Sequence, residues 1–298
     1  MMHVNYDEQQ PRYLEYLSFL YFLSSVFFLG ALVPFHRTMW LSLLLGAALA
    51  LPLLLALHRL ISRFGQGKAM LSAAAAAAAC LFAVTLYCFS QFLDACVLQE
   101  LPMWLFPGAF LLCCAYTAAK DIHVLERFSK LCGPVILILL FLALCSGGAK
   151  ASLTMEYGFF SWRDFMPPRA QALTGGGMFF ALLFLVQYLV LAVLVNAKRK
   201  TPAPFKDAAK GFWLSAVFLS ASCLVAALAL GPDVFELLAY PVYYPPGLTG
   251  TAEYLERIEV ILLAVFVFSE FVKTSLCLMA IKEALLVIFS KKNFQERN

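Results

Sequence analysis

The chain has 298 residues, of which 62% are hydrophobic and 13% are charged, with a mean hydropathy of +0.82 and a net charge of +4. Soluble domains carry roughly 25% charged residues, so this composition excludes a soluble globular protein and requires a lipid bilayer. The positive charge forms no basic stripe on a polar face, which excludes nucleic acid as a partner.

The apolar residues form eight long runs, which are continuous rather than alternating with a period of two. Continuous runs of ~20 residues predict transmembrane helices, because the strands of a membrane barrel would alternate. We therefore predict an all-α polytopic membrane protein with a single integral membrane domain over residues 1–298. The expected spans are Tyr13–Pro34, Trp40–Ile61, Met70–Phe92, Leu101–Ala118, Leu131–Cys145 (with a start before Leu131), Leu173–Val195, Gly211–Leu230 and Ile258–Phe289.

The basic residues of the connectors predict the orientation. With a cytoplasmic N-terminus, 15 of the 22 Lys and Arg residues lie in inside segments, five lie in outside segments and two lie in the last span. This distribution satisfies the positive-inside rule, so both termini are expected in the cytoplasm.

Two outer connectors are rich in aromatic residues and proline. They are Tyr157–Pro168, which reads YGFFSWRDFMPP, and Val234–Pro246, which reads VFELLAYPVYYPP. Such sequences suit interfacial segments or short half-helices, because aromatic rings rest at the level of the headgroups. They serve either as an aromatic belt or as an extracellular gate.

The chain carries none of the common motifs of soluble enzymes. It contains no phosphate-binding loop, no dinucleotide-binding glycine fingerprint, no HExxH and no GxSxG, and its four histidines are scattered at the ends of spans. We expect no catalytic residue, no metal site and no cofactor. A membrane-embedded hydrolase with an unfamiliar motif is the enzymatic alternative.

Two stretches of small residues stand out from the apolar background. Thr174-Gly175-Gly176-Gly177 opens the sixth expected span and is either a helix break near a binding site or a plain junction between loop and helix. Leu71–Cys80 reads LSAAAAAAAC, and a face of small side chains lets a neighbouring helix approach closely. We expect packing rather than function from this alanine run.

The strongest signal is a pair of charges inside the last span. Glu270 and Lys273 are three residues apart and share one helix face, with Ser269, Thr274 and Ser275 beside them. A lone charge at the bilayer centre costs roughly 2.5–3.5 kcal/mol, so such residues point inward and pair. We expect this charge pair to neutralise itself, either to fix the rotation of the helix or as the polar floor of a ligand, ion or proton site.

Three segments, Leu125–Leu140, Gly231–Pro241 and Tyr254–Phe268, read LERFSKLCGPVILILL, GPDVFELLAYP and YLERIEVILLAVFVF. Together they resemble the B subunit of endospore germination receptors, the spore permease family of the amino-acid/polyamine permease superfamily. The segment Phe184–Lys200 is similar to the end of that family's sixth helix and its basic cytoplasmic loop.

The resemblance implies two inverted five-helix repeats around a ligand site near the membrane middle. It also implies partners, namely an A-type subunit and a C-type lipoprotein subunit, and a role in sensing small germinants, typically amino acids, in the spore inner membrane. Broken first and sixth helices would form the site, and the third and eighth would line it. On this chain the implied ligand-binding residues are Ser24, Ser25, Tyr87, Gly175, Gly176, Gly177, Ser269 and Thr274.

The chain also departs from that family's pattern. The family has ten spans, so we expect a first repeat over about residues 13–147 and a partial second repeat over about 173–290 that lacks the last two helices. Phe27, Leu29 and Val186 stand where the family has glycines in its broken helices. Bulky residues there would keep the helices continuous and fill the ligand space.

Three functions stay open at this point. The first is a germinant-sensing receptor subunit, and the second is an amino-acid transporter coupled to protons through Glu270. The third is a scaffold subunit that holds its partners and binds no small ligand.

Overall fold

The structure is a computed structural model that describes residues 11–28, 38–64, 68–96, 105–156, 170–198, 205–238, 240–243 and 258–290. Every regular element within these ranges is helical, which confirms the all-α prediction. The elements are α1 (Pro11–Leu23), the 3-10 helix η1 (Ser24–Phe27), α3 (Met39–Phe64), α4 (Lys68–Cys96), α5 (Leu105–Ala119), α6 (Ile122–Glu156), α7 (Ala170–Lys198), α8 (Phe205–Leu230), α9 (Pro232–Leu237) and α10 (Ile258–Ser290).

Six of the described helices, α3, α4, α6, α7, α8 and α10, are long and apolar enough to cross a membrane. The helices α1 and α5 contribute shorter apolar segments, Leu14–Val26 and Phe106–Ala119. The eight expected spans thus correspond to six long and two short helices, and a polytopic membrane protein is confirmed. Because α6 already begins at Ile122, the fifth span does start before Leu131.

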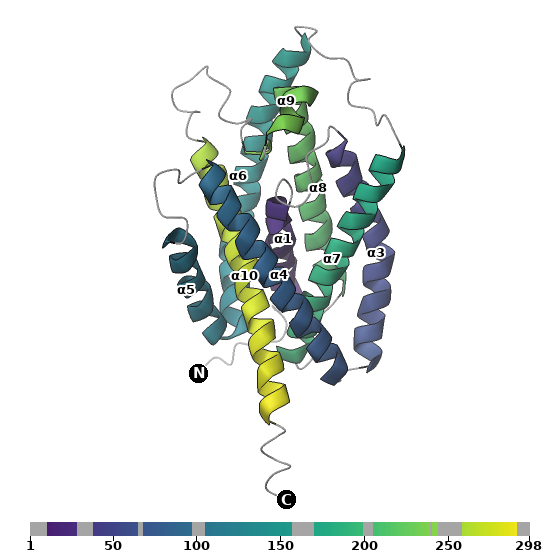
Figure 1. Ribbon diagram of the computed structural model, residues 1–298, viewed down its shortest axis with the longest axis vertical. Coiled ribbons are helices and arrows are strands. Elements are labelled where there is room, and N and C mark those ends of the chain that lie inside the picture. The colour runs from purple at the N-terminus through teal and green to yellow at the C-terminus, as the bar shows by residue number, and fades with distance from the viewer. Residues whose placement is uncertain are drawn as a thin grey trace, which may run out of the picture.

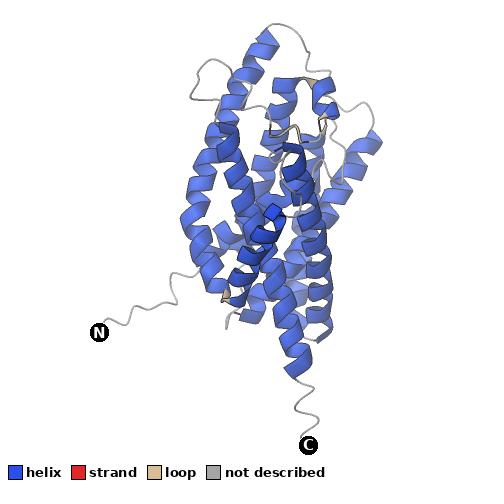
Figure 2. Cartoon of the chain, turned by 60° about the vertical axis from the view of Figure 1, so that its left-hand side comes forward, coloured by secondary structure: helices blue, strands red, loops and turns tan. Residues whose placement is uncertain are grey.

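The helices form an elongated bundle in which consecutive helices among α1, α3, α4, α5, α6, α7, α8 and α10 run in opposite directions (Figure 1). The turned view shows the same bundle with its helices roughly along one axis (Figure 2). The start of α1 and the end of α10 therefore lie at the same end of the bundle, which we call the α8-start end because α8 also begins there.

Helix α1 is the core of the bundle. Its residues Leu17, Leu20 and Phe22 are completely buried, and so are Phe19 and Tyr21 on its other faces. A helix that is apolar all round belongs inside a protein rather than at its surface. It packs against α8, α6 and α10, while α3 pairs with α7 and α4 pairs with α10.

Two glycines let helices approach closely. A Cβ atom at Gly211 of α8 would collide with the Ser18 hydroxyl and the backbone of Glu15 on α1. A Cβ atom at Gly46 of α3 would lie 2.6 Å from the Cβ atom of Phe180 on α7. Both contacts need a residue without a side chain, as at other close crossings of membrane helices.

The described part of the connector after α8 forms a cap over α4. Gly231 takes a positive φ of 83°, which only glycine adopts readily, and turns the chain into the short helix α9. Beyond α9, the rings of Tyr240 and Tyr243 stand edge-on to Phe92 of α4 with centroids 5.1 and 5.5 Å away. Whether this cap acts as an aromatic belt or a gate stays a prediction, and Tyr157–Pro168 lies outside the described residues.

Candidate functional site

The middle of α10 carries a polar face that is sealed inside the bundle. Ser269, Glu270, Lys273, Thr274 and Ser275 each have 0% of their surface exposed. The helix is continuous through this stretch and packs against α1, η1, α4, α5, α6 and α7. Glu270 and Lys273 therefore face protein on every side and are withdrawn from lipid and solvent.

Lys273 reaches across to the N-terminal part of the chain. Its Nζ atom donates a hydrogen bond of 3.4 Å to the hydroxyl of Ser25 in η1. The same ammonium lies 4.4 Å from the ring centroid of Phe28 and 5.8 Å from that of Tyr21. A hydroxyl and two aromatic faces thus replace water around this buried cation.

Ser25 connects the lysine to a third helix. Its Oγ atom lies 3.1 Å from Oε1 and 3.0 Å from Nε2 of Gln187 in α7. The side chains of Ser25, Gln187 and Lys273 are all buried. Gln187 was not among the residues expected at the site. Its signal in the sequence is a single amide within FLVQYLVLAV, an otherwise apolar and aromatic run.

Glu270 is held differently from the lysine one turn away. Its Oε1 atom accepts a hydrogen bond of 3.4 Å from the Thr274 hydroxyl, and its Oε2 atom is buried without a hydrogen-bond partner within the described residues. A buried polar atom without a partner carries a desolvation penalty, and more so if it is charged. Oε2 is therefore an acceptor that a ligand or a proton would satisfy.

Glu270 and Lys273 were expected to neutralise each other, but their described side chains form no contact ion pair. No ion pair joins them, although they share a helix face as expected. The reason is that each finds another neutral partner, Thr274 for the carboxylate and Ser25 for the ammonium. We call Ser25, Gln187, Glu270, Lys273 and Thr274 the central cluster.

Of the other expected site residues, two serines lie beside the central cluster but turn back to their own helices. Ser24 donates to the carbonyl of Tyr21, and Ser269 donates to that of Phe266. Tyr87 does not join them, since 56% of its surface is exposed on the outside of α4.

The glycine run is neither a helix break nor a junction, because α7 starts at Ala170 and continues unbroken to Lys198. A Cβ atom at Gly176 would lie 3.0 Å from Ser42 Oγ, and one at Gly177 would lie 3.0 Å from Leu45 Cδ2, both on α3. The run therefore serves helix packing. Gly177 precedes Gln187 by ten residues, or about 15 Å along the helix axis, so it does not touch the central cluster.

Continuity of α7 agrees with what the bulky Val186 predicts, whereas the first helix behaves otherwise. After Leu23, α1 tightens into the 3-10 helix η1, which places Ser25 and Phe28 next to Lys273. Short 3-10 turns are frequent at the ends of α-helices, and within a helix they often mark a functional hinge. Leu29 lies outside the described residues.

No group of three or more His, Cys, Asp and Glu side chains that could hold a metal ion occurs within the described ranges. The chemistry available in the central cluster is therefore hydrogen bonding and charge: one ammonium with polar partners, and one carboxylate with an unused oxygen.

Comparison with known proteins gives one match. Residues 19–296 of the 298 match a family model, the spore permeases, described as spore germination protein. No curated protein matches the chain, and no solved structure does. The match includes every residue of the central cluster.

Proposed function

Because this chain belongs to the spore permease family of germination proteins, it is a permease-like membrane protein, and we propose that it senses a small zwitterionic germinant, such as an amino acid, in its central cluster. The observation that supports this most directly is a buried carboxylate and a buried ammonium on one helix face that do not pair with each other.

Each charge keeps unused capacity for a ligand of opposite charge. The Oε2 atom of Glu270 would accept a ligand ammonium, because it has no partner within the described chain. Among the described residues Lys273 donates one hydrogen bond, to Ser25, so that a ligand carboxylate would find further N–H donors on the ammonium there. A zwitterion would thereby neutralise both charges at once.

In the described conformation the central cluster is closed to solvent, since its five side chains are at most 3% exposed. Binding therefore requires a second, more open conformation. A ligand that interacts more strongly with one conformation than with the other shifts the population toward it. That shift is the signal that we propose is passed to partner subunits of the A and C types.

We further propose that both termini are cytoplasmic, in the bacterial cytoplasmic membrane and the spore inner membrane. The distribution of Lys and Arg supports this orientation. The arrangement of α1 and α10 is compatible with it, because the start of one and the end of the other lie at the same end of the bundle (Figure 1).

The test is isothermal calorimetry of an amino-acid panel on the purified protein in nanodiscs, with the N-acetylated and amidated form of each ligand beside it. We expect saturable binding that is weakened when either end of the ligand is blocked. Lys273→Met and Glu270→Gln should remove it, and Tyr87→Ala, an exposed residue of the same bundle, should leave it unchanged.

A scaffold that binds nothing small is the second candidate, and the unbroken helix α7 favours it. Transporters bind their substrates beside discontinuous helices. Absence of binding to folded protein, with stable association of an A-type partner, would support the scaffold and refute the sensor. If ligands bind, uptake into proteoliposomes would identify a transporter, and loss of its pH dependence in Glu270→Gln would assign proton coupling to that residue.

A further inference from the structure

A groove of about 660 Å³ opens between α1, α3 and α8 toward the α8-start end. Its wall is mostly apolar and includes Leu51 of α3 and Leu214 and Val217 of α8. Its charged residues are Glu15, Lys206 and Lys210. None of the residues of the central cluster lines it.

The face of α8 in this groove changes character along its length. Lys206, Lys210, Trp213 and Val217 follow one another at intervals of four, three and four residues, so they share one helix face. Over about 16 Å this face passes from ammonium groups to an indole and then to an aliphatic side chain. A glycerophospholipid has the same order, with its charged headgroup, its ester groups and its acyl chains.

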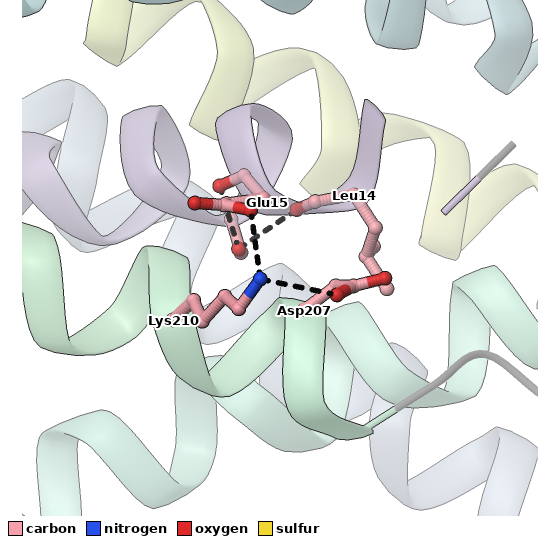
Figure 3. Close-up of polar contacts among 5 residues, drawn as sticks. Leu14, Glu15, Asp207 and Lys210 are labelled. Carbon is pink, nitrogen blue, oxygen red and sulfur yellow. Dashed lines mark hydrogen bonds and ion pairs between the residues drawn. The ribbon is translucent and has the colours of Figure 1, made fainter. Parts of the chain in front are cut away.

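The charges at the end of the groove are unevenly paired. Lys210 Nζ lies 3.5 Å from Glu15 Oε2 and 3.9 Å from Asp207 Oδ1, so one cation serves two carboxylates (Figure 3). We call these three residues the edge trio, and its formal net charge is negative. Lys206 is exposed and forms no ion pair with any residue that the structure describes.

The groove holds one further unused donor. The indole N–H of Trp213 has no hydrogen-bond partner among the described residues, although half-buried tryptophans normally find one. Trp213 stands seven residues after Lys206, which is about 10 Å deeper along the helix. An ester carbonyl lies on that side of a phosphate, toward the acyl chains.

We propose that this groove binds one phosphatidylethanolamine molecule, a phospholipid whose headgroup carries both a phosphate and a primary ammonium. The phosphate pairs with Lys206, and the ammonium donates to the Glu15 carboxylate, the member of the edge trio that lines the groove with an acidic group. The Trp213 N–H donates to an ester carbonyl, and an acyl chain lies along Leu214 and Val217.

The charge pattern selects this headgroup over two others. Phosphatidylglycerol carries a phosphate but no cation, so it leaves the negative edge trio without a partner. Phosphatidylcholine has the same charges as phosphatidylethanolamine, but its quaternary ammonium has no N–H to donate to Glu15. Lipid that merely surrounds the bundle would show no such preference.

The experiment is native mass spectrometry of the intact, delipidated protein, titrated in turn with the three phospholipids carrying identical acyl chains. We expect phosphatidylethanolamine to bind about threefold to fivefold more tightly than either alternative, as exposed ion pairs allow. Lys206→Gln should abolish the preference. Glu15→Gln removes the excess negative charge and should shift the preference to phosphatidylglycerol.

Two further variants separate the groove from the general surface. Ala209→Trp fills the groove that Ala209 lines and should prevent tight binding of all three lipids. Arg63→Gln neutralises an exposed cation in the last turn of α3, outside the groove, and should change nothing. Melting temperatures of all variants check that they are folded.

Equal affinities for the three lipids in the unaltered protein would overturn the proposal. So would a preference for phosphatidylglycerol before Glu15 is changed, or a preference that survives Lys206→Gln.

Discussion

The central cluster and the edge trio place acids and bases together in opposite ways. In the central cluster, Glu270 and Lys273 belong to one helix, are fully buried, and each bond to a neutral hydroxyl instead of to one another. In the edge trio, Lys210 pairs directly with carboxylates of two helices while half of its side chain stays exposed. In the buried central cluster, the nearest partners of Glu270 and Lys273 are hydroxyl groups and aromatic rings, not the opposite charge.

The two arrangements have different energetics. Exposed ion pairs contribute about 0–1 kcal/mol, because water solvates the separated charges almost as well. A buried charge has lost its water, and the effective penalty is several kcal/mol unless protein groups compensate it. The central cluster therefore depends on each of its partners, whereas the edge trio tolerates the loss of one.

The largest effect is expected for Lys273→Met. This change removes the hydrogen bond to Ser25 and also the nearby positive charge, which attracts the Glu270 carboxylate through space although the two side chains form no contact ion pair. We expect the free energy of unfolding to fall by about 3 kcal/mol. Titration of the purified protein from mild detergent into sodium dodecyl sulfate measures it.

The control for this variant is the double substitution with Glu270→Gln. Glu270→Gln alone should cost less than Lys273→Met, because the amide oxygen still accepts from Thr274. The double variant should be more stable than Lys273→Met, since no stranded carboxylate remains. Equal stability of Lys273→Met and the double variant would show that the two charges do not compensate each other.

The second-largest effect is expected for Gly211→Ala, which tests the close crossing of α1 and α8 beside the edge trio. In Gly211→Ala the added Cβ atom meets the backbone of α1, which cannot move aside as a side chain would. We expect a loss of about 1–3 kcal/mol in the free energy of unfolding, as overpacking typically costs. The same detergent titration measures it.

Gly175→Ala is the matched control, because Gly175 also lies within a helix but has no atom within 4 Å of the place where a Cβ atom would stand. Alanine is the better helix former by roughly 0.5–1 kcal/mol, so this variant should be neutral or more stable. If both alanines cost the same, the close crossing of α1 and α8 is not what Gly211 provides.

The contrast between these regions also shows what the sequence could predict. Length and hydropathy predicted the membrane helices, and the cost of burying a charge singled out Glu270 and Lys273. The sequence could not predict their separate partners. Ser25 and Gln187 lie 162 residues apart in the sequence, and only the folded bundle brings their side chains together.

Tyr87 and the three glycines of the glycine run lie away from the central cluster for a related reason. Tyr87 and the glycine run were assigned to the site through the resemblance, which gives a position along a helix but not the face that the helix presents. In α4 the face with Tyr87 is exposed, while Cys88 one residue later is buried. Around Gly176 and Gly177 the close neighbour is α3, so the missing side chains serve a helix crossing instead of a ligand.

The third effect tests the link between helices within the central cluster. Ser25→Ala removes the hydroxyl that Lys273 and Gln187 share, and leaves both buried groups without this partner. We expect a loss of about 1–3 kcal/mol in the free energy of unfolding. Ser24→Ala is the control, since that hydroxyl bonds only within its own helical turn, and a cost equal to that of Ser25→Ala would argue against a special role for the shared hydroxyl.

The smallest effect is expected for Lys210→Gln. It breaks both contacts of the edge trio, yet water can still reach the freed carboxylates, since the side chains of Glu15 and Asp207 are 32% and 14% exposed. We expect the free energy of unfolding to change by no more than about 0.5 kcal/mol, and by less in high salt, where exposed ion pairs are screened. Denaturation at low and at high salt measures both quantities. A loss as large as that of Ser25→Ala, unchanged by salt, would mean that the edge trio is as dependent on its partners as the central cluster, and that burial is not what separates the two regions.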